Sequence, residues 1–149
     1  MSDSQYAVIY DLHSHTTASD GRLTPQELVH RAHEMRVGTL AITDHDSVAA
    51  IPAAREEIAR AGLPLTLVNG VEISTLWENI VGLNIDIAHP TMTALLEEQK
   101  ARRQQRGQMI AERLEKARIP GAWEGALRLA DGGAVTRGHF ARFLVEAGH

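Results

Sequence analysis

The sequence predicts an α/β protein whose first part forms parallel βαβ units and whose remainder is mostly helical. Up to residue 87, short runs of β-branched and aliphatic residues alternate with segments of helical periodicity, as in parallel sheets joined by helices. Beyond residue 90 the strand pattern stops, and charged, helix-forming residues follow. The chain has 149 residues, which suits one ordinary domain and falls well short of a complete eight-fold α/β barrel.

The first two strands enclose a well-marked helix. Residues 6–12, YAVIYDL, are rich in aromatic and β-branched side chains and predict a buried strand. Thr24 is expected to cap the next helix, with Pro25 at its first position and Gly38 at its end. Residues 39–43, TLAIT, predict the second strand.

The alternation of helix and strand then continues. A helix is predicted from about residue 47 to residue 61, with Pro52 beginning a second segment and Gly62 ending it. Residues 65–69 predict a third strand, which leads into the segment GVEIS. Residues 80–86 predict a fourth strand, which we expect to join the same parallel sheet.

The rest of the chain predicts a helical insert or subdomain. Helices are expected at residues 91–117 and 122–130, and Thr136 is expected to cap a final helix. We therefore divide the chain into residues 1–90 and residues 91–149.

The composition is that of a globular protein that would bind metals through His, Asp and Glu. Hydrophobic residues make up 44% and charged residues 23%, so a packed core is expected. The absence of cysteine excludes disulfides and thiolate zinc sites and suits a reducing cytosol. A net charge of −4 argues against a general attraction for nucleic acid. Without a signal-like segment or an apolar run of bilayer length, we expect a cytoplasmic protein with no membrane partner.

Side chains that bind metals follow three successive strands. The carboxyl ends of parallel strands converge on one face, so these side chains are expected to meet there. His13 and His15 share one face of an extended segment and can hold one ion. Imidazole and carboxylate ligands suit Zn²⁺, Mn²⁺ or Fe²⁺. The constellation comprises His13, His15, Asp20, Asp44, His45, Asp46 and Glu72.

Each element of this constellation also has an interpretation without metal. A His-x-His pattern is common by chance, and Asp20-Gly21 alone is most simply a turn. Asp44 could cap the following helix, and Glu72 could be exposed at a strand end. Coincidence at three consecutive strand ends is improbable, so we favour a metal site.

The motifs resemble those of the PHP (polymerase and histidinol phosphatase) metallophosphoesterases. The resemblance rests on DLHSHTTASDG at 11–21, ITDHD at 42–46 and GVEIS at 70–74, in the order found in that family. TRGHFAR at 136–142 is similar to a segment of the branch of 3′,5′-nucleoside bisphosphate phosphatases and 5′-to-3′ exoribonucleases. The resemblance implies the amino-terminal part of a distorted (β/α) barrel, incomplete in this chain, with a mostly helical insert.

The resemblance also implies a function and a set of site residues. The implied activity is metal-dependent phosphoester hydrolysis by a metal-activated hydroxide, acting on 3′,5′-nucleoside bisphosphates, on short RNA in the 5′-to-3′ direction, or on both. Up to three divalent ions are implied, with Mn²⁺ expected and Zn²⁺ or Fe²⁺ as alternatives. The implied metal ligands are His13, His15, Asp20, His45 and Glu72, with Glu72 as a bridge. The implied phosphate contacts are Arg137 and His139, at a predicted helix N-terminus, which favours anions.

Departures from the family pattern leave other functions open. The His-x-His segment that the family carries before IVGL is missing between Asn79 and Ile80, and the family's later His-Pro and Asp-x-His ligands are not matched. We interpret His89-Pro90 as a turn. One alternative is a metal-binding but inactive fragment whose helical part is an interaction module. Another is a PHP phosphatase with a different phosphomonoester substrate, such as histidinol phosphate, or one that acts on a DNA end.

For three further features we favour a structural interpretation over a functional one. The basic run at 100–106, KARRQQR, could follow an RNA backbone but is expected to be a solvated helix face. His30 and His33 are expected on the solvent side of the first helix. Trp77 and Trp123 are too few to predict a base-stacking platform.

Overall fold

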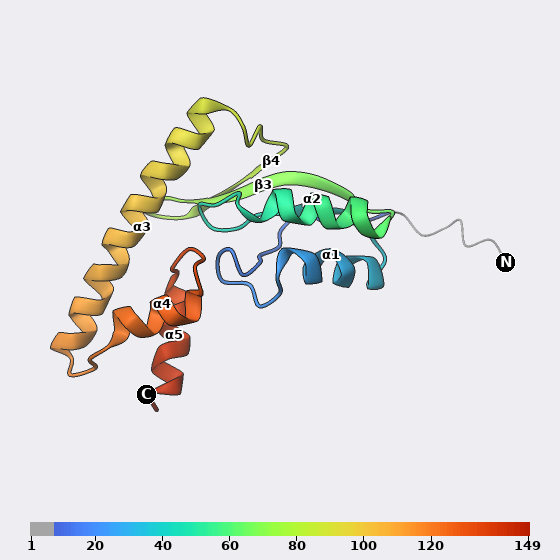
Figure 1. Ribbon diagram of the computed structural model, residues 1–149. Helices are drawn as coiled ribbons and strands as arrows, with labels where there is room; N and C mark the ends of the chain where they lie inside the picture. Colours follow the sequence, from blue (N-terminus) through green and yellow to red (C-terminus); the bar gives the residue numbers. More distant parts are fainter. Residues whose placement is uncertain (1–7) are drawn as a thin grey trace.

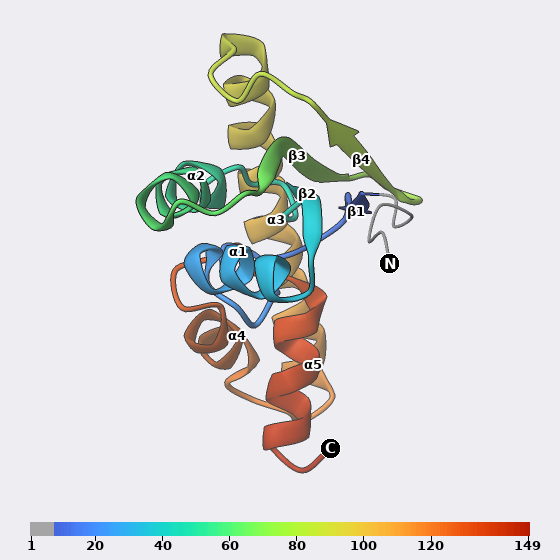
Figure 2. The ribbon, with the colours of Figure 1, turned by 90° about the vertical axis from the view of Figure 1, so that its right-hand side faces the viewer.

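The computed structural model of the chain describes residues 8–149, so Tyr6 and Ala7 of the first predicted strand lie outside the described residues. Figures 1 and 2 show a sheet with helices packed on it and a group of helices at one end. The elements are β1 (Ile9–Asp11), α1 (Pro25–Glu34), β2 (Val37–Ile42), α2 (Ala50–Ala61), β3 (Thr66–Ser74), β4 (Asn79–Leu83), α3 (Pro90–Lys116), α4 (Ala122–Ala130) and α5 (Arg137–Glu146).

The sheet has the strand order β1-β2-β3-β4. The first three strands are parallel, which confirms the predicted βαβ units. The prediction is wrong for β4, which runs antiparallel to β3. Only residues 75–78 separate these two strands, whereas a parallel crossover needs a dozen or more residues. The backbone N–H of Thr75 donates to the carbonyl of Glu78 at 3.0 Å and closes the hairpin turn.

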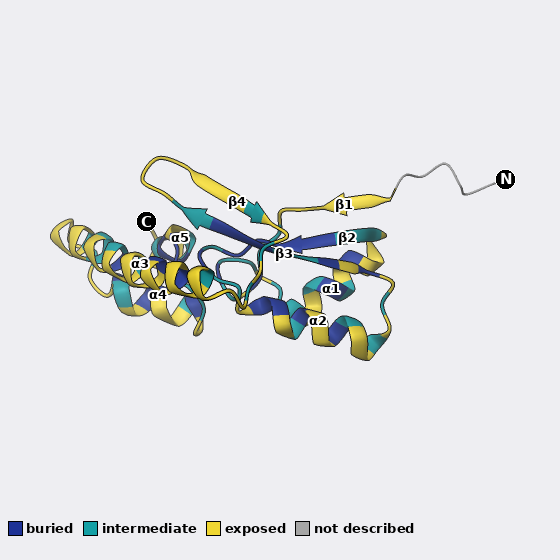
Figure 3. Cartoon of the chain, turned by 90° about the horizontal axis from the view of Figure 1, so that it is seen from above, coloured by how far each residue is buried: buried dark blue, intermediate teal, exposed yellow. Residues whose placement is uncertain are grey.

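The first strand is predicted to be buried, but β1 is exposed. The side chain of Tyr10 is 64% exposed and that of Ile9 49%. β1 lies at the edge of the sheet, and β2 is its only strand neighbour among the described residues. α1 and α2 pack on one face of the sheet (Figure 3). A strand rich in β-branched residues therefore forms an edge of this sheet and not its core.

α1 begins as its sequence predicts and ends earlier. The Thr24 side chain accepts a hydrogen bond from the backbone N–H of Glu27, and Pro25 is the first helical residue. The sequence predicts an end at Gly38, whereas the helix ends at Glu34. Arg36 has a φ of 61°, in the left-handed region, which is incompatible with a continuing helix.

α2 is one helix rather than two segments. Pro52 lies in its first turn, where a missing N–H breaks no intrahelical hydrogen bond, so the predicted second start is wrong. Gly62 ends the helix with a φ of 62°, as predicted, because glycine adopts this left-handed conformation at low cost.

Two hydrophobic clusters stabilise the described residues. The first packs the sheet against α1 and α2 around Val29, Leu40 and Ile51. The second joins α3, α4 and α5 around Ala126 and Phe140. The division of the chain at residue 90 stays a prediction, although α3 begins at that position. α3 is 27 residues long and rich in charge, and no described helix is long and apolar enough to cross a membrane.

Candidate metal centre

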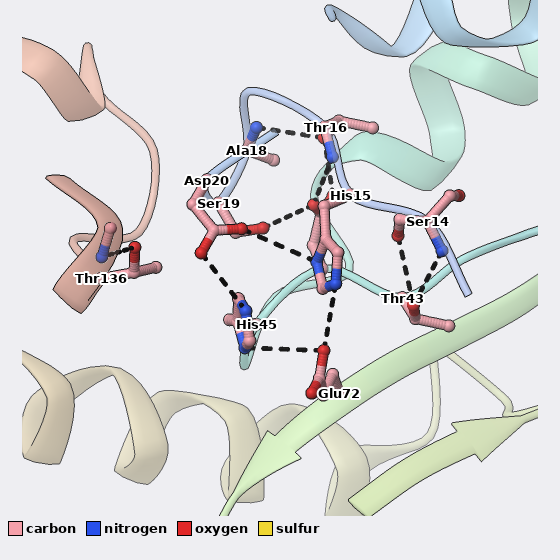
Figure 4. Close-up of polar contacts among 12 residues, drawn as sticks. Ser14, His15, Thr16, Ala18, Ser19, Asp20, Thr43, His45, Glu72 and Thr136 are labelled. Carbon is pink, nitrogen blue, oxygen red and sulfur yellow. Dashed lines mark hydrogen bonds and ion pairs between the residues drawn. The ribbon is translucent and has the colours of Figure 1, made fainter. Parts of the chain in front are cut away.

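Five side chains predicted as metal ligands meet beside the ends of β1 and β2 and the last third of β3. Figure 4 shows four of them, His15, Asp20, His45 and Glu72. His13, His15 and Asp20 belong to the loop after β1, and His45 follows β2. Glu72 lies within β3 and is only 8% exposed, so its interpretation as an exposed strand end is wrong. We call His13, His15, Asp20, His45 and Glu72 the five-residue cluster.

One group of ligand atoms surrounds a single oxygen of Glu72. Glu72 Oε2 lies 3.0 Å from His13 Nε2 and 3.1 Å from His15 Nε2. The two histidine nitrogens are themselves 3.2 Å apart. All three atoms therefore face the same small space, which is the arrangement that three ligands of one ion require.

A second group shares His15 with the first. His45 Nε2 lies 3.4 Å from Asp20 Oδ2, and His15 Nδ1 lies 3.9 Å from Asp20 Oδ1. The rings of His15 and His45 are stacked with centroids 4.6 Å apart. His45 Nδ1 is 3.7 Å from Glu72 Oε2, which links this group to the first.

The chemistry of His15 fits a divalent metal. Its Nδ1 atom is buried and has no hydrogen-bond partner among the described residues, which is rare for a polar atom inside a protein. Burial lowers the pKa of His15, and the neighbouring His45 lowers it further. The neutral imidazole is the form that binds metal, so an ion with nitrogen and oxygen ligands is supported by the residues present.

The two carboxylates of the five-residue cluster are held in the charged form. A hydrogen bond from His45 lowers the pKa of Asp20 strongly, against the opposing effect of burial. Burial raises the pKa of Glu72, but hydrogen bonds from His13 and Asn79 outweigh it, and the net shift is downward. The hydrogen bond to Asp20 in turn raises the pKa of His45.

Asp20 is expected to make the metal-free chain sensitive to acid. Its folded pKa lies below the ordinary value of 3.8, so its contribution to stability is complete above that value. The contribution is lost as the pH falls through the lower, folded pKa. Urea unfolding in the presence of a chelator should therefore show that Asp20→Asn flattens the fall in stability below about pH 4. The exposed Asp131→Asn variant should retain the steep wild-type fall, and equal curves for both variants would refute this role.

Asp44 supports the loop that carries the cluster and does not cap a helix. Its side chain is fully buried and accepts from the Thr16 N–H at 2.7 Å, the Thr16 hydroxyl at 2.6 Å and the Ser19 hydroxyl at 2.6 Å. α2 has no side-chain cap, so the alternative role predicted for Asp44 is wrong. The sequence does not single out Thr16 and Ser19 as partners of Asp44. Neighbouring side chains of an extended segment point to opposite sides, so Asp44 and His45 are expected to point apart, and this is the one hint that Asp44 has a different role.

Gly21 allows the loop to turn tightly between His15 and Asp20. A Cβ atom at Gly21 would lie 2.3 Å from the backbone oxygen of His15. We expect Gly21→Ala to lower the free energy of unfolding by about 1–3 kcal/mol and to weaken metal binding, because the loop must shift. Gly82→Ala is the matched control, since no atom would lie closer than 3.4 Å to its Cβ. Denaturant unfolding and metal titration of both variants test this, and wild-type behaviour of Gly21→Ala would contradict it.

The start of α5 lies against the cluster through Asp20. Arg142 donates to the backbone oxygen of Asp20 at 2.8 Å. Arg137 is exposed at the first position of α5. His139 is only 2% exposed, and its Nδ1 accepts from the Thr136 N–H at 2.9 Å in a capping box. Contact of Arg137 and His139 with a phosphate stays a prediction. For His139 the contact would have to come from Nε2, because Nδ1 is used in the capping box.

Asn79 occupies the place where the family pattern leads us to expect a histidine-containing segment. Its amide donates to Glu72 Oε1 at 3.0 Å. The second oxygen of Glu72 is thus already paired within the chain, while Oε2 faces the histidines. The turn at residues 75–78 contains no histidine.

Other residues singled out in the sequence lie away from the cluster. His30 and His33 both face solvent as predicted: the His30 side chain is 42% exposed, with its Nε2 2.7 Å from Glu57 Oε1, and His33 is exposed. His89 ends a turn, as predicted, since its backbone N–H donates to the Asp86 carbonyl at 3.2 Å. It also caps α3, because its Nδ1 accepts from the N–H of Thr91 at 3.1 Å. Trp77 is 94% exposed in the β3–β4 turn.

A cavity of about 600 Å³ lies between the loop after β2 and the helices α3 and α4. Its wall is mostly apolar and includes Leu96 and Trp123; its charged members are Asp46, Glu97, Lys100 and Arg103. No residue of the five-residue cluster lines it. His13, at the edge of the cluster, has a side chain that is more than half exposed, so the cluster opens to solvent separately from this cavity.

Comparison with known protein families shows to which family the chain belongs. A family model described as the PHP domain matches residues 11–106, which contain the whole five-residue cluster. The chain belongs to the PHP domain family. The resemblance inferred from the sequence motifs is thereby confirmed.

Curated relatives of this PHP chain include enzymes of RNA and nucleotide metabolism. The 5′-3′ exoribonuclease Rnm of Salmonella typhimurium is 78% identical, over 99% of this chain and 52% of the relative. The 3′,5′-nucleoside bisphosphate phosphatase of Chromobacterium violaceum is 41% identical, over 93% of this chain and 50% of the relative. A solved amidohydrolase from the same organism, with bound sulfate and no metal, matches with a TM-score of 0.84 at 40% identity, over 93% of this chain and 50% of that one.

These matches show that the PHP chain contains part of a longer fold. It spans about half the length of the relatives and of the solved structure, so the barrel is incomplete in this chain. The alignment with the Salmonella enzyme extends over 152 positions, more than the 149 residues here. At least three positions of that enzyme therefore have no counterpart in this chain.

Proposed function

We propose that this PHP chain is the metal-binding part of a phosphoesterase that hydrolyses 3′,5′-nucleoside bisphosphates, short RNA from its 5′ end, or both. The observation that carries the proposal is the convergence of His13, His15 and Glu72 within 3.2 Å of one another, with Asp20 and His45 adjoining. The names of the curated relatives support the substrate class. We propose Mn²⁺ as the bound ion and a cytoplasmic location, in keeping with a chain that lacks cysteine.

The proposed roles follow from the placement of each side chain. His13, His15 and Glu72 would hold one ion, and Asp20 with His45 would hold a second near it. Bound divalent ions lower the pKa of water and offset negative charge on a phosphoryl group. Arg137, exposed at the start of α5, would bind a substrate phosphate, and the positive end of the helix dipole would favour that anion. His139 would contact the same phosphate through its Nε2, while its Nδ1 holds Thr136.

The proposal is tested by assaying the purified chain with Mn²⁺ against four substrates. Adenosine 3′,5′-bisphosphate and a short 5′-phosphorylated RNA should be hydrolysed in preference to a short DNA and histidinol phosphate. The His13→Ala/His15→Ala variant should lose this activity completely, while His33→Ala, on the exposed side of α1, should retain it. Full activity of the double variant would refute the metal-centred function. Preference for histidinol phosphate or DNA would refute the proposed substrate class.

A second candidate function is metal binding without turnover, with the helical part acting as an interaction module. Two observations favour it: the residues missing relative to the Salmonella enzyme, and the pairing of Glu72 Oε1 with Asn79. Metal bound in stoichiometric amounts, with none of the four substrates hydrolysed, would establish this candidate and reject the phosphoesterase activity of this chain.

A further inference from the structure

In the basic run at 100–106, Arg103 points inward. Among the described residues, it is the one residue of this run that forms an ion pair with a residue outside α3. Its side chain is only 11% exposed, although it lies on α3 among exposed residues. The expected solvated helix face therefore does not include Arg103. The guanidinium donates to Asp46 Oδ2 at 2.6 Å, to the Ser74 hydroxyl at 2.7 Å and to the Val135 carbonyl at 3.2 Å.

Arg103 thereby connects segments that are distant in the sequence. Asp46 follows the metal-ligand candidate His45, Ser74 ends β3, and Val135 precedes α5. A guanidinium whose donors are spread over three such partners cannot also neutralise an RNA phosphate. Burial and geometry therefore oppose a role for Arg103 in following a nucleic acid backbone.

Asp46 is the receiving end of this contact. Its side chain is 2% exposed and also accepts from the Ser74 N–H at 2.9 Å and from the Gln99 amide at 3.2 Å. Its backbone N–H donates to the carbonyl of Glu72 at 2.9 Å. The φ of Asp46 is 51°, a left-handed conformation that a non-glycine residue keeps only when surrounding contacts hold it.

The contacts of Asp46 bear directly on the spacing of two cluster residues. Asp46 is covalently next to His45 and is hydrogen-bonded through its backbone to Glu72. Together with the hydrogen bond from the Glu72 N–H to the Asp44 carbonyl at 3.0 Å, this bond forms an isolated parallel bridge between His45 and Glu72 outside the regular sheet pairing. The left-handed turn at Asp46 thus sets where His45 Nδ1 lies relative to Glu72 Oε2, which are 3.7 Å apart.

We propose that Arg103 and Asp46 form a positioning pair through which α3 of the helical part fixes His45 against Glu72 and thereby sets the metal affinity of the cluster. This inference rests on the proposed metal centre. The helical part would then contribute to metal affinity, whether or not it also binds another molecule. Neither residue touches the ion itself, because the Asp46 carboxylate points to α3 and away from the histidines.

The test compares Arg103→Ala with Arg102→Ala, its neighbour on α3. Arg102 is exposed and pairs only with Glu98 among the described residues, so it is a matched control for loss of charge and helix content. Calorimetric titration with Mn²⁺ measures affinity, and thermal unfolding in a chelator measures stability. Supporting partners of metal ligands typically change affinity by about 10–100-fold. We expect Arg103→Ala to weaken Mn²⁺ binding about tenfold and Arg102→Ala to change it less than about twofold.

Two further variants separate positioning from simple loss of folding. Arg103→Lys keeps the charge but not the forked geometry and should recover part of the affinity. In Asp46→Asn, addition of Arg103→Ala should weaken binding much less than it does in the wild type, because the pair is already broken. If Arg103→Ala does not fold, Arg103→Lys and Asp46→Asn carry the test, each with weakened Mn²⁺ binding expected.

The outcomes distinguish this inference from the proposed function. Wild-type Mn²⁺ affinity in the folded Arg103→Ala and Asp46→Asn variants would overturn the positioning role while leaving the metal centre intact. Affinity lost equally in Arg102→Ala would overturn it as well, since a general charge effect would then explain the result. Failure of the wild-type chain to bind Mn²⁺ would overturn the metal centre itself.

Discussion

Glu72→Gln is expected to reduce Mn²⁺ affinity by about 100-fold or more and to abolish hydrolysis. Glu72 Oε2 is the one described atom that faces three histidines, at 3.0 Å from His13, 3.1 Å from His15 and 3.7 Å from His45. Loss of a residue that only supports a metal ligand lowers metal affinity by about 10–100-fold. Loss of a charged ligand that is shared should therefore lower metal affinity by at least about 100-fold. Metal titration by calorimetry measures the effect directly.

Glu78→Gln provides the matched control for Glu72→Gln. Glu78 lies six residues further on, in the exposed turn between β3 and β4, and the same change of charge there touches no cluster residue. We expect unchanged Mn²⁺ affinity and unchanged stability in this variant. Similar affinities in the two variants would mean that Glu72 is not a metal ligand.

Asp44→Ala is expected to cause the largest loss of stability, about 3–5 kcal/mol in the metal-free chain. The Asp44 carboxylate satisfies the Thr16 N–H and the hydroxyls of Thr16 and Ser19 in a fully buried position. Removing the acceptor leaves these donors without partners and a void beside them, and each buried unsatisfied donor costs about 1–3 kcal/mol. Urea unfolding in a chelator measures the change without a contribution from bound metal.

Asp86→Ala is the control for the loss of an aspartate. Asp86 is much less buried than Asp44 and accepts one hydrogen bond from the N–H of Ala88 at 3.0 Å. Its removal should cost about 1 kcal/mol or less. An Asp44→Ala variant as stable as Asp86→Ala would show that the loop at residues 13–20 does not depend on the buried carboxylate.

The sequence is most informative where chemistry is local. His13, His15 and Asp20 fall within eight residues, and the strand–helix alternation is enough to predict that His45 joins them. Capping signals likewise predict the starts of α1 and α5, at Thr24 and Thr136. In each case a short segment contains both the signal and the interaction.

The predictions fail where partners are distant or where an element's neighbours decide its environment. Asp46 and Arg103 are 57 residues apart, and no local pattern links them. β1 has the composition of a buried strand but lies at the edge of the sheet. The alternation of strand and helix in the sequence suggests that β4 is parallel, whereas the shortness of the connection at residues 75–78 makes it antiparallel.

The most direct test of the metal centre is a crystal structure of the chain grown with Mn²⁺, with data collected on both sides of the manganese absorption edge. We expect an anomalous peak within bonding distance of His13, His15 and Glu72, and a second peak, where occupied, beside Asp20 and His45. The Glu72→Gln crystals should lack the first peak. Absence of manganese from the five-residue cluster in the wild-type crystals, or its presence only at other surface carboxylates, would show that the cluster is not a metal centre.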